Sequence, residues 1–481
     1  MSEYQKIKKG LRISIVEGAF AHVLANLVGS IFLPSFALLL GANAFQIGLL
    51  ASIQFFSTLA QIPGSLLVEK LAHRKIIAVL FAFLSRALWL PLIVAGFWLL
   101  SKESSGVMLN LLIFVVIGYH VLAAISGVSW LSWMSSMVPE EIRGRFFGLR
   151  NSILGMVTIV ITIAGGNFLD LFPGLFPDLS IQIAFFILFS IACLSGLISG
   201  ILLFRQPELE RPQPYRGGYH ALYTEPLRNQ NFRRLLYFAV VWSFAVNFAA
   251  PFYVVYMLKD LHINYTLISV FTVASALADL TGMGIWGHYS EHFGNRPIMI
   301  ITASLAGILP FLWIFTSQNL ISIYFLIPLF HMLGGYIVSG YNLTSVNLVL
   351  RSVPAERNSI YFAFWAASNG IMAGFGALCG GLMATSIQMP FSLFHLEFSS
   401  VYKVIFLASS VLRLSSLFFL LKVQEEKGAP VRRVIRILRN VRSWASMMGY
   451  HPVLQFFLPA KDNHKNKSEY WPIWQFRKSV N

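Results

Sequence analysis

The sequence predicts an all-α, polytopic membrane protein with twelve transmembrane helices in two six-helix halves. Hydrophobic residues make up 56% of the 481 residues and charged residues only 12%, whereas soluble domains average about 25% charged residues. The apolar residues come in blocks of about 18 to 27 residues, each long enough to cross a hydrocarbon core of about 30 Å. Polar loops between these blocks recur at a nearly constant offset, which indicates a duplicated chain.

The first apolar block is expected to be a retained span. It begins near Ile13 and contains Glu17 and His22. It is therefore too long and too polar for a signal peptide, and no small-residue cleavage site follows it. The twelve spans are expected at residues 14–40, 45–68, 76–100, 107–134, 152–170, 182–204, 235–258, 266–287, 298–316, 320–350, 360–388 and 402–421.

A stretch rich in proline and glycine separates the halves. Residues 205–234 form the only long internal linker, and residues such as Pro207, Pro212 and Gly217 break any helix there. We therefore expect an N-terminal six-helix half at 1–204, a cytoplasmic linker at 205–234, a C-terminal six-helix half at 235–422 and a basic tail at 423–481.

The basic residues fall almost entirely on one side of the predicted membrane. The exceptions among the 36 lysines and arginines are Lys102, Lys259 and Lys403 in outer loops and Arg86 and Arg413 inside spans. Lysine and arginine concentrate on the cytoplasmic side, so both termini are expected there, in a bacterial inner (plasma) membrane. The net charge of +16 is then a topology signal and requires no nucleic-acid partner.

The tail contains a predicted basic amphipathic helix. Apolar residues recur at helical spacing from Val431 to Met448, with arginines between them, a pattern suited to the anionic lipids of an inner leaflet. A regulatory or partner-binding role for this helix is the alternative. The two cysteines, Cys193 and Cys379, lie inside spans without a thiol or histidine at metal spacing, so we expect no disulfide framework, metal site or cofactor.

Two polar loops of the first half are echoed in the second. Residues 138–144 (Val-Pro-Glu-Glu-Ile-Arg-Gly) correspond to 353–357 (Val-Pro-Ala-Glu-Arg), and residues 64–75 correspond to 282–296. In the second pair Glu69 aligns with Glu291, and Arg74 with Arg296. A membrane chain built from two similar halves is the usual plan of a secondary transporter.

These motifs resemble those of the major facilitator superfamily over roughly residues 10–425. Residues 287–297 (Gly-His-Tyr-Ser-Glu-His-Phe-Gly-Asn-Arg-Pro) are similar to the superfamily's loop between helices 8 and 9, and residues 64–75 are a weaker copy. The stretch 139–144 is similar to the loop after helix 4, and Leu33-Pro34 fits the end of helix 1. The sequence departs from the proton-coupled drug exporters of the superfamily, because helix 4 lacks an arginine and helix 5 lacks a Gly-Pro pair.

The resemblance implies that the repeated loops form a cytoplasmic gate. A carboxylate in such a loop can pair with a nearby arginine or lie against a helix N-terminus, and these contacts would break when the halves separate. An ordinary solvated loop salt bridge is the alternative. Glycine suits a tight turn that needs a positive φ. The candidate gate residues are Glu69, Arg74, Arg143, Glu291, Gly294, Arg296 and Arg357.

Polar residues inside predicted spans are the candidate substrate or coupling residues, because such groups are costly in the membrane. Asp279 lies about eight residues from the end of its helix, or roughly 12 Å deep; it is either a proton-coupling group or half of a buried pair. Glu17 is either an interfacial charge or a coupling carboxylate. Arg86 is expected to form a structural pair, or to favour an anionic substrate if it reaches a cavity. The further candidates are Gln54, Gln61, His120, Asn247, His331, Asn342 and Asn369.

The sequence thus predicts a secondary active transporter that moves a small solute by alternating access, with a proton or another ion as the coupling partner. No nucleotide-binding Gly-x-x-x-x-Gly-Lys-Ser/Thr motif is present. No nucleophile–base set points to an enzyme. A lipid or glycolipid translocase of the same fold, and a non-transporting membrane scaffold or sensor, are the alternatives.

Overall fold

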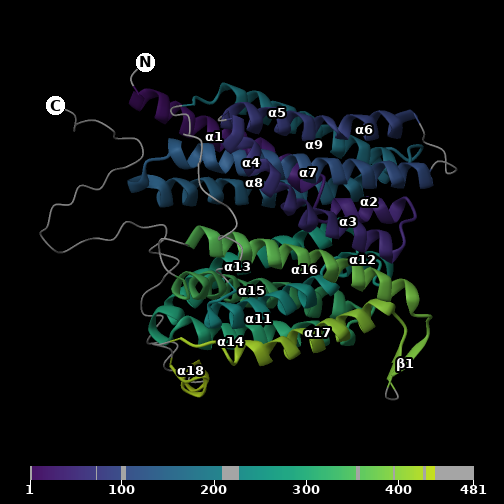
Figure 1. Ribbon diagram of the computed structural model, residues 1–481. Coiled ribbons are helices and arrows are strands. Elements are labelled where there is room, and N and C mark those ends of the chain that lie inside the picture. The colour runs from purple at the N-terminus through teal and green to yellow at the C-terminus, as the bar shows by residue number, and fades with distance from the viewer. Residues whose placement is uncertain are drawn as a thin grey trace, which may run out of the picture. The chain divides into compact units, whose positions relative to one another are not determined.

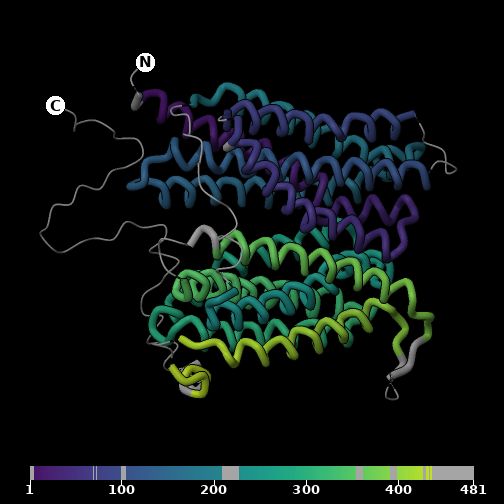
Figure 2. Tube along the Cα trace, in the orientation of Figure 1, coloured from purple at the N-terminus to yellow at the C-terminus, as the bar shows by residue number. Residues whose placement is uncertain are grey.

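The computed structural model describes most of the chain (Figures 1 and 2). The described residues are 3–71, 73–98, 105–208, 227–353, 358–393, 396–425 and 429–438. The chain divides into two compact units, Met1–Val431 and Arg432–Asn481. Each unit is considered by itself.

The first unit contains the predicted twelve spans, since twelve helical stretches among the described residues are long and apolar enough to cross a membrane. Those of the first half are built from α1 (Glu3–Leu27) with α2 (Phe32–Leu39), α3 (Ala44–Phe56) with η1 (Ser57–Ala60) and α4 (Gln61–Leu71), α5 (Arg74–Ala87) with α6 (Trp89–Trp98), α7 (Ser105–Met137), α8 (Glu140–Leu175) and α9 (Ile181–Arg205).

The spans of the second half follow in the same order. They are built from α11 (Gln230–Ala249) with α12 (Phe252–Lys259), α13 (Tyr265–Phe293), α14 (Asn295–Leu312) with η3 (Trp313–Phe315), η4 (Ser322–Leu326) with α15 (Ile327–Arg351), α16 (Asn358–Ser386) and α17 (Val401–Leu420). The fold class and the number of spans are therefore confirmed.

Two features differ from the prediction in detail. Helix α8 covers Glu140–Leu175, well beyond the expected 152–170, because a helix can continue past the apolar core when polar residues suit its first turn. Glu140 and Glu141 lie in that turn, where carboxylates interact favourably with the helix dipole. A short antiparallel hairpin, β1 (Phe391–Leu393) and β2 (Leu396–Phe398), also precedes the last span.

The bundle has two ends that differ in how the halves meet. We call the end with the start of α1 and the end of α17 the proximal end, and the opposite end the distal end. The largest hydrophobic core joins both halves toward the distal end, through residues such as Phe32, Phe36, Phe185, Phe252 and Tyr256. Toward the proximal end each half has its own core, one around Trp133 and Met134 and one around Phe232 and Trp242. The halves are thus packed together distally and form separate cores proximally.

Close contacts between helix backbones join the halves distally. Helix α3 packs along α16, and α8 packs along α13. A Cβ added at Gly48 would lie 2.4 Å from the carbonyl oxygen of Ala377, and one added at Gly166 would lie 2.8 Å from that of Tyr265. Contacts below 3.0 Å are not tolerated, so both positions require glycine in this conformation.

Of the second unit, the structure describes residues 432–438. Together with Val431 they form helix α18 (Val431–Leu438), which is the start of the predicted amphipathic helix. The remainder of that predicted helix, from residue 439 onward, lies outside the described residues.

Candidate functional site

The first span of each half is broken at the same place, and both breaks line one cavity. Helix α1 ends at Leu27 and α2 begins at Phe32, while α11 ends at Ala249 and α12 begins at Phe252. At the first break Ser30 has a φ of 44°, a value that non-glycine residues rarely adopt. Broken helices at membrane depth are tolerated where they line a cavity, and in transporters they form the substrate site.

This central cavity has a volume of about 400 Å³ and is lined by both halves. Leu33, Ile47, Leu50 and Phe55 give it apolar walls. Three of the predicted candidate residues also line it: Gln54, His120 and Asn247. An apolar cavity with a few polar groups is the common form of a small-molecule site.

A second cavity of about 260 Å³ lies within the first half and contains a buried charge cluster. Glu17 lies at its centre: Arg86 Nη2 is 3.5 Å from Glu17 Oε1, and Arg150 Nη2 is 3.7 Å from Oε2. The Ser199 hydroxyl donates to Glu17 Oε1 at 2.7 Å. The structure therefore brings together Glu17 and Arg86, two predicted candidates, and adds Arg150, which the sequence analysis counted only as a loop charge.

The two cavities adjoin, since Ala25 and Tyr119 line both. Tyr119 also packs edge-on against His120, with ring centroids 4.9 Å apart. Ala25 and Tyr119 therefore form a wall that the two cavities share.

Five predicted candidates lie outside both cavities: Gln61, Asp279, His331, Asn342 and Asn369. Asn369 accepts a hydrogen bond from the Ser243 hydroxyl at 2.6 Å and thereby joins α16 to α11. Asp279 Oδ1 and His331 Nε2 are buried without a hydrogen-bond partner among the described residues. His331 instead packs against the rings of Phe271 and Trp313. Asp279 thus shows no cation partner in the part of the chain that the structure describes.

Asp170 makes a polar contact between the halves at the distal end. Its carboxylate accepts hydrogen bonds from the backbone N–H groups of Tyr265, at 3.1 Å, and Thr266, at 2.7 Å. These N–H groups belong to the first two residues of helix α13 and have no hydrogen-bond partner within the helix. A carboxylate there is also favoured by the helix dipole, so Asp170 strengthens distal closure.

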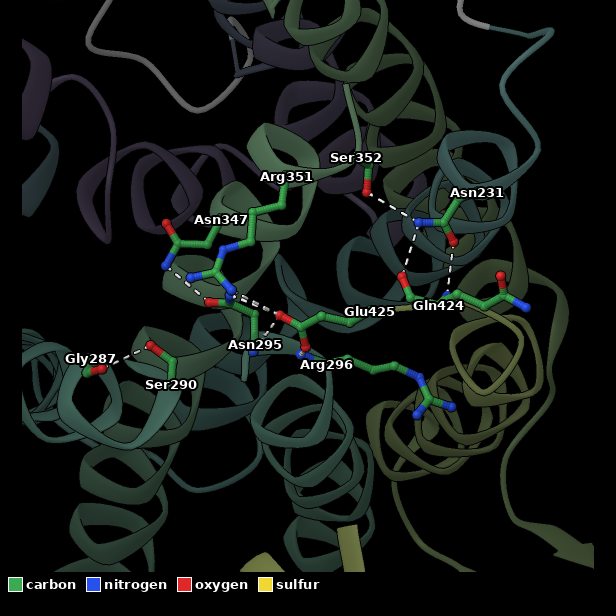
Figure 3. Close-up of polar contacts among 10 residues, drawn as sticks. All are labelled: Asn231, Gly287, Ser290, Asn295, Arg296, Asn347, Arg351, Ser352, Gln424 and Glu425. Carbon is green, nitrogen blue, oxygen red and sulfur yellow. Dashed lines mark hydrogen bonds and ion pairs between the residues drawn. The ribbon is translucent and has the colours of Figure 1, made fainter. Parts of the chain in front are cut away.

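At the proximal end of the second half, Glu425 holds the start of helix α14 (Figure 3). Its Oε1 accepts from Asn295 N at 2.9 Å, its Oε2 accepts from Arg296 N at 2.7 Å, and Arg351 Nη1 is 3.4 Å from Oε1. Asn347 supports the cluster by donating to Asn295 Oδ1 at 3.1 Å. Next to it, Asn231 pairs with the backbone of Gln424. The segment after α17 is thereby tied to α11, α14 and α15.

The predicted gate residues are distributed around this end. Glu291 is exposed and makes no ion pair within the described part of the chain, while Arg296 Nη2 donates to the Leu421 carbonyl at 2.8 Å. In the first half, Arg74 donates to the Ser132 carbonyl at 3.1 Å, and Arg143 donates to that of Ser135 at 3.1 Å. The arginines therefore contact carbonyl groups of neighbouring segments, and the suggested Glu291–Arg296 pair is not formed in this conformation.

Of the three remaining gate candidates, the structure describes only Gly294 fully. Gly294 has a φ of 93°, so the turn does need a residue that tolerates positive φ. Arg357 lies outside the described residues, and so does the side chain of Glu69.

Replacing Glu425 by glutamine is expected to loosen the start of α14. The substitution removes the charge that Arg351 pairs with and weakens two hydrogen bonds to backbone donors, for a loss of about 1–3 kcal/mol of local stability. Amide hydrogen exchange over residues 294–298 should then become faster. Glu291→Gln is the matched control, because Glu291 is exposed and forms no ion pair with any residue that the structure describes. Equal exchange rates in Glu425→Gln and the parent protein would show that Glu425 does not hold this helix end.

Arg150, Asp170 and Glu425 could not be recognised from the sequence, for different reasons. Arg150 lies just before, and Asp170 at the end of, the span expected at 152–170, and the helix proved longer than that, so both looked like loop or interfacial charges. Glu425 follows the last span and resembled an ordinary tail residue. The glycine before α14, which offers no side-chain cap, was the one signal that this helix start needs an outside acceptor such as Glu425.

These features define a class of protein. Twelve spans in two halves surround a central cavity, with paired helix breaks in its wall, and this is an architecture found in membrane transporters. A sequence model described as "Major Facilitator Superfamily" matches residues 18–256 and again residues 235–460. The chain belongs to this superfamily, as its loop motifs suggested. No curated protein matches the chain.

Solved structures with the same fold include transporters of different solutes. The nucleoside transporter NupG has a TM-score of 0.62 at 14% identity, covering 88% of this chain and 100% of its own. A bacterial homologue of the human lysosomal transporter Spinster, described as inward-facing and occupied, has a TM-score of 0.61 at 14% identity and covers 88% and 97%. The xylose transporter XylE from E. coli, described as inward open, has a TM-score of 0.56 at 13% identity and covers 91% and 100%. These likenesses establish the fold.

Proposed function

We propose that the protein is a secondary active transporter that moves a small solute through the central cavity by alternating access. The observation that carries this proposal is the pair of helix breaks, one in each half, that line the same cavity of about 400 Å³. Gln54, His120 and Asn247 would hydrogen-bond the solute, and the apolar walls would enclose it. A coupling proton or ion would provide the driving energy, with Asp279 and Glu17 as the carboxylates suited to coupling.

The conformation of the structure corresponds to one state of the proposed transport cycle. We propose that both termini are cytoplasmic, in a bacterial inner membrane, because basic residues concentrate on the proximal side. The proximal end is then the cytoplasmic end. The halves are closed by a shared core distally and have separate cores proximally, which corresponds to an inward-facing state. Asp170 and the glycine contacts would form the outer gate, and the Glu425 cluster would remain within one half.

Transport is tested with the purified protein in proteoliposomes. Uptake of radiolabelled uridine, D-xylose and benzoate would be measured with and without an inward proton gradient. Uridine and D-xylose are chosen because structural neighbours are described as nucleoside and xylose transporters. Benzoate is chosen because it is an anion and the second cavity contains two arginines. The proposal predicts gradient-driven accumulation of at least one probe. Asn247→Ala should raise KM for that probe, whereas the control Asn110→Ala, exposed on α7, should not.

Orientation and alternation are tested in the same preparation without any solute. In a background with Cys193 and Cys379 replaced by alanine, spin labels would be placed at Asp178 and Gln318 distally and at His73 and His292 proximally, all exposed positions. Two inversely related distance populations would support alternating access. A single population at both ends, together with no uptake of any probe, would overturn the proposed function. A membrane-impermeant maleimide should label a cysteine at position 73 only from the cytoplasmic side.

The same experiment separates the alternatives. A fluorescent phospholipid included in the proteoliposomes would cross the bilayer if the protein is a lipid or glycolipid translocase. A scaffold or sensor would neither alternate nor transport. Binding of anionic lipids by the basic tail stays a prediction and is independent of these outcomes.

A further inference from the structure

The charge cluster in the second cavity carries more positive than negative charge. Its charged residues are Glu17, Arg86 and Arg150, so one carboxylate faces two guanidinium groups. His22 also lines the cavity and adds positive charge whenever it is protonated. No other acidic side chain lines it within the described residues. An uncompensated charge inside the membrane is costly. The cluster has a net charge of one positive unit when His22 is neutral.

Two buried donors in the same cavity lack an acceptor. Arg86 Nη1 and the Trp130 indole Nε1 have no hydrogen-bond partner among the described residues, although both atoms are buried. Both residues line the second cavity. Unpaired buried donors are rare in folded proteins, and two donors beside a surplus positive charge suit an oxyanion. A water molecule could accept one hydrogen bond, but it would not neutralise the charge.

The other arginine inside a span, Arg413, differs from Arg86 in its hydrogen bonds. Arg413 is also buried, but its donors are used: Nε donates to Ser409 Oγ at 3.1 Å and Nη1 donates to the Ala306 carbonyl at 3.0 Å. It lines neither of the two cavities. Every guanidinium nitrogen of Arg413 thus has an acceptor, whereas Arg86 Nη1 has none among the described residues.

The surroundings hold both arginines in position. The Arg150 guanidinium stacks on Trp130 at 4.7 Å from the ring centroid, and its Nε donates to the Ser14 carbonyl at 3.3 Å. Added Cβ atoms at Gly18 and Gly200 would lie 2.5 Å and 3.1 Å from guanidinium atoms of Arg150 and Arg86. Small residues on α1 and α9 thus leave space for the two side chains, which gives a preorganised site.

We propose that the solute is a small organic anion whose oxyanion group binds Arg86, Arg150 and Trp130, while its apolar part lies in the adjoining central cavity. This inference rests on the proposed transport function and specifies its substrate class. Glu17 competes with the anion for the same guanidinium groups, so an arriving anion takes over part of the pairing that Glu17 provides in this conformation. Carboxylate and phosphate groups share the required chemistry.

Binding is tested on the full-length protein in nanodiscs by calorimetry. Benzoate and phenyl phosphate are the anionic probes, and benzamide is the neutral counterpart of benzoate. Benzoate or phenyl phosphate should bind at least about tenfold more tightly than benzamide. Arg86→Gln should weaken anion binding about ten- to a hundredfold, and Arg86→Lys should weaken it less. Arg205→Gln, which removes an exposed arginine from the same half, should leave the affinity unchanged.

Glu17→Gln provides a test with the opposite sign, since loss of the competing carboxylate should tighten anion binding. A purely structural cluster would bind anions more weakly, or not at all, after this change. The proposal is overturned if benzamide binds as tightly as both anions. It is also overturned if anion affinity is unchanged in Glu17→Gln, or unchanged in a folded Arg86→Gln or Arg86→Lys variant. Uptake of uridine or D-xylose, but no anion binding, would reject this inference and leave transport intact. Absence of alternation and of all uptake would reject the proposed function itself.

Discussion

Glu17→Gln is expected to destabilise the protein by about 3–5 kcal/mol, because it leaves two buried guanidinium groups without their carboxylate. The Glu17 side chain is only 6% exposed and the two arginine side chains are 10% and 11% exposed, and water in the cavity would not neutralise the charge that Glu17 balances. Thermal unfolding can be followed by the reaction of buried Cys193 with a thiol-reactive dye. The control is Glu141→Gln, which changes an exposed carboxylate on α8.

A second substitution distinguishes charge imbalance from loss of packing. The double variant Glu17→Gln/Arg86→Gln removes one charge of each sign, so it should recover part of the stability lost in Glu17→Gln. Addition of benzoate should also stabilise Glu17→Gln more than the parent protein. A midpoint for Glu17→Gln within about one degree of the parent would contradict the assigned ion pairs, since a loss of 3 kcal/mol shifts the midpoint of a domain by several degrees.

Gly48→Leu is expected to open the distal end and shift the conformational equilibrium at least about tenfold, which corresponds to 1.4 kcal/mol. The added Cβ would lie 2.4 Å from the Ala377 carbonyl oxygen and 3.2 Å from the Gly381 Cα. Because these atoms belong to the other half, the clash is relieved when the halves separate distally. Spin-label distances between positions 178 and 318 should lengthen, and those between 73 and 292 should shorten.

Gly376→Leu is the matched control for this result. A Cβ at Gly376 would lie 2.3 Å from the Phe244 carbonyl oxygen, but both residues belong to the second half. Relative motion of the halves cannot relieve that clash, so this variant should lose thermal stability in place of changing conformation. Asp170→Asn should shift the equilibrium in the same direction as Gly48→Leu, by less. Unchanged distances in Gly48→Leu would show that this contact does not control distal closure.

The sequence predicted the spans well because their cause is local. A stretch of about twenty apolar residues is compatible with the hydrocarbon core wherever it lies in the chain, and no knowledge of neighbours is needed. The positive φ at Gly294 was predictable for the same reason, since the motif places a tight turn there. The length of α8 was underestimated, because nothing in hydropathy shows where a helix continues beyond the membrane.

The candidate site was only partly predictable because it depends on distant partners. Glu17 and Arg86 were recognised singly as charges at membrane depth, but their pairing spans 69 positions in the chain. Arg150 joins them because α8 rotates that residue toward α1, a packing detail without a sequence signature. Asp279 met every sequence criterion and nevertheless lies outside both cavities. Membrane depth identifies a costly residue, whereas helix packing decides what the residue faces.

The core shared by the two halves distally has a thermodynamic consequence. Opening that end would place apolar surface in contact with water, such as the rings of Phe185 and Tyr265, which meet across the halves at 5.9 Å, whereas the proximal cores lie within each half. Hydration of apolar surface carries a positive heat capacity and becomes less unfavourable on cooling. In the proposed alternating-access cycle, the equilibrium between the two facings will therefore vary with temperature along a curve.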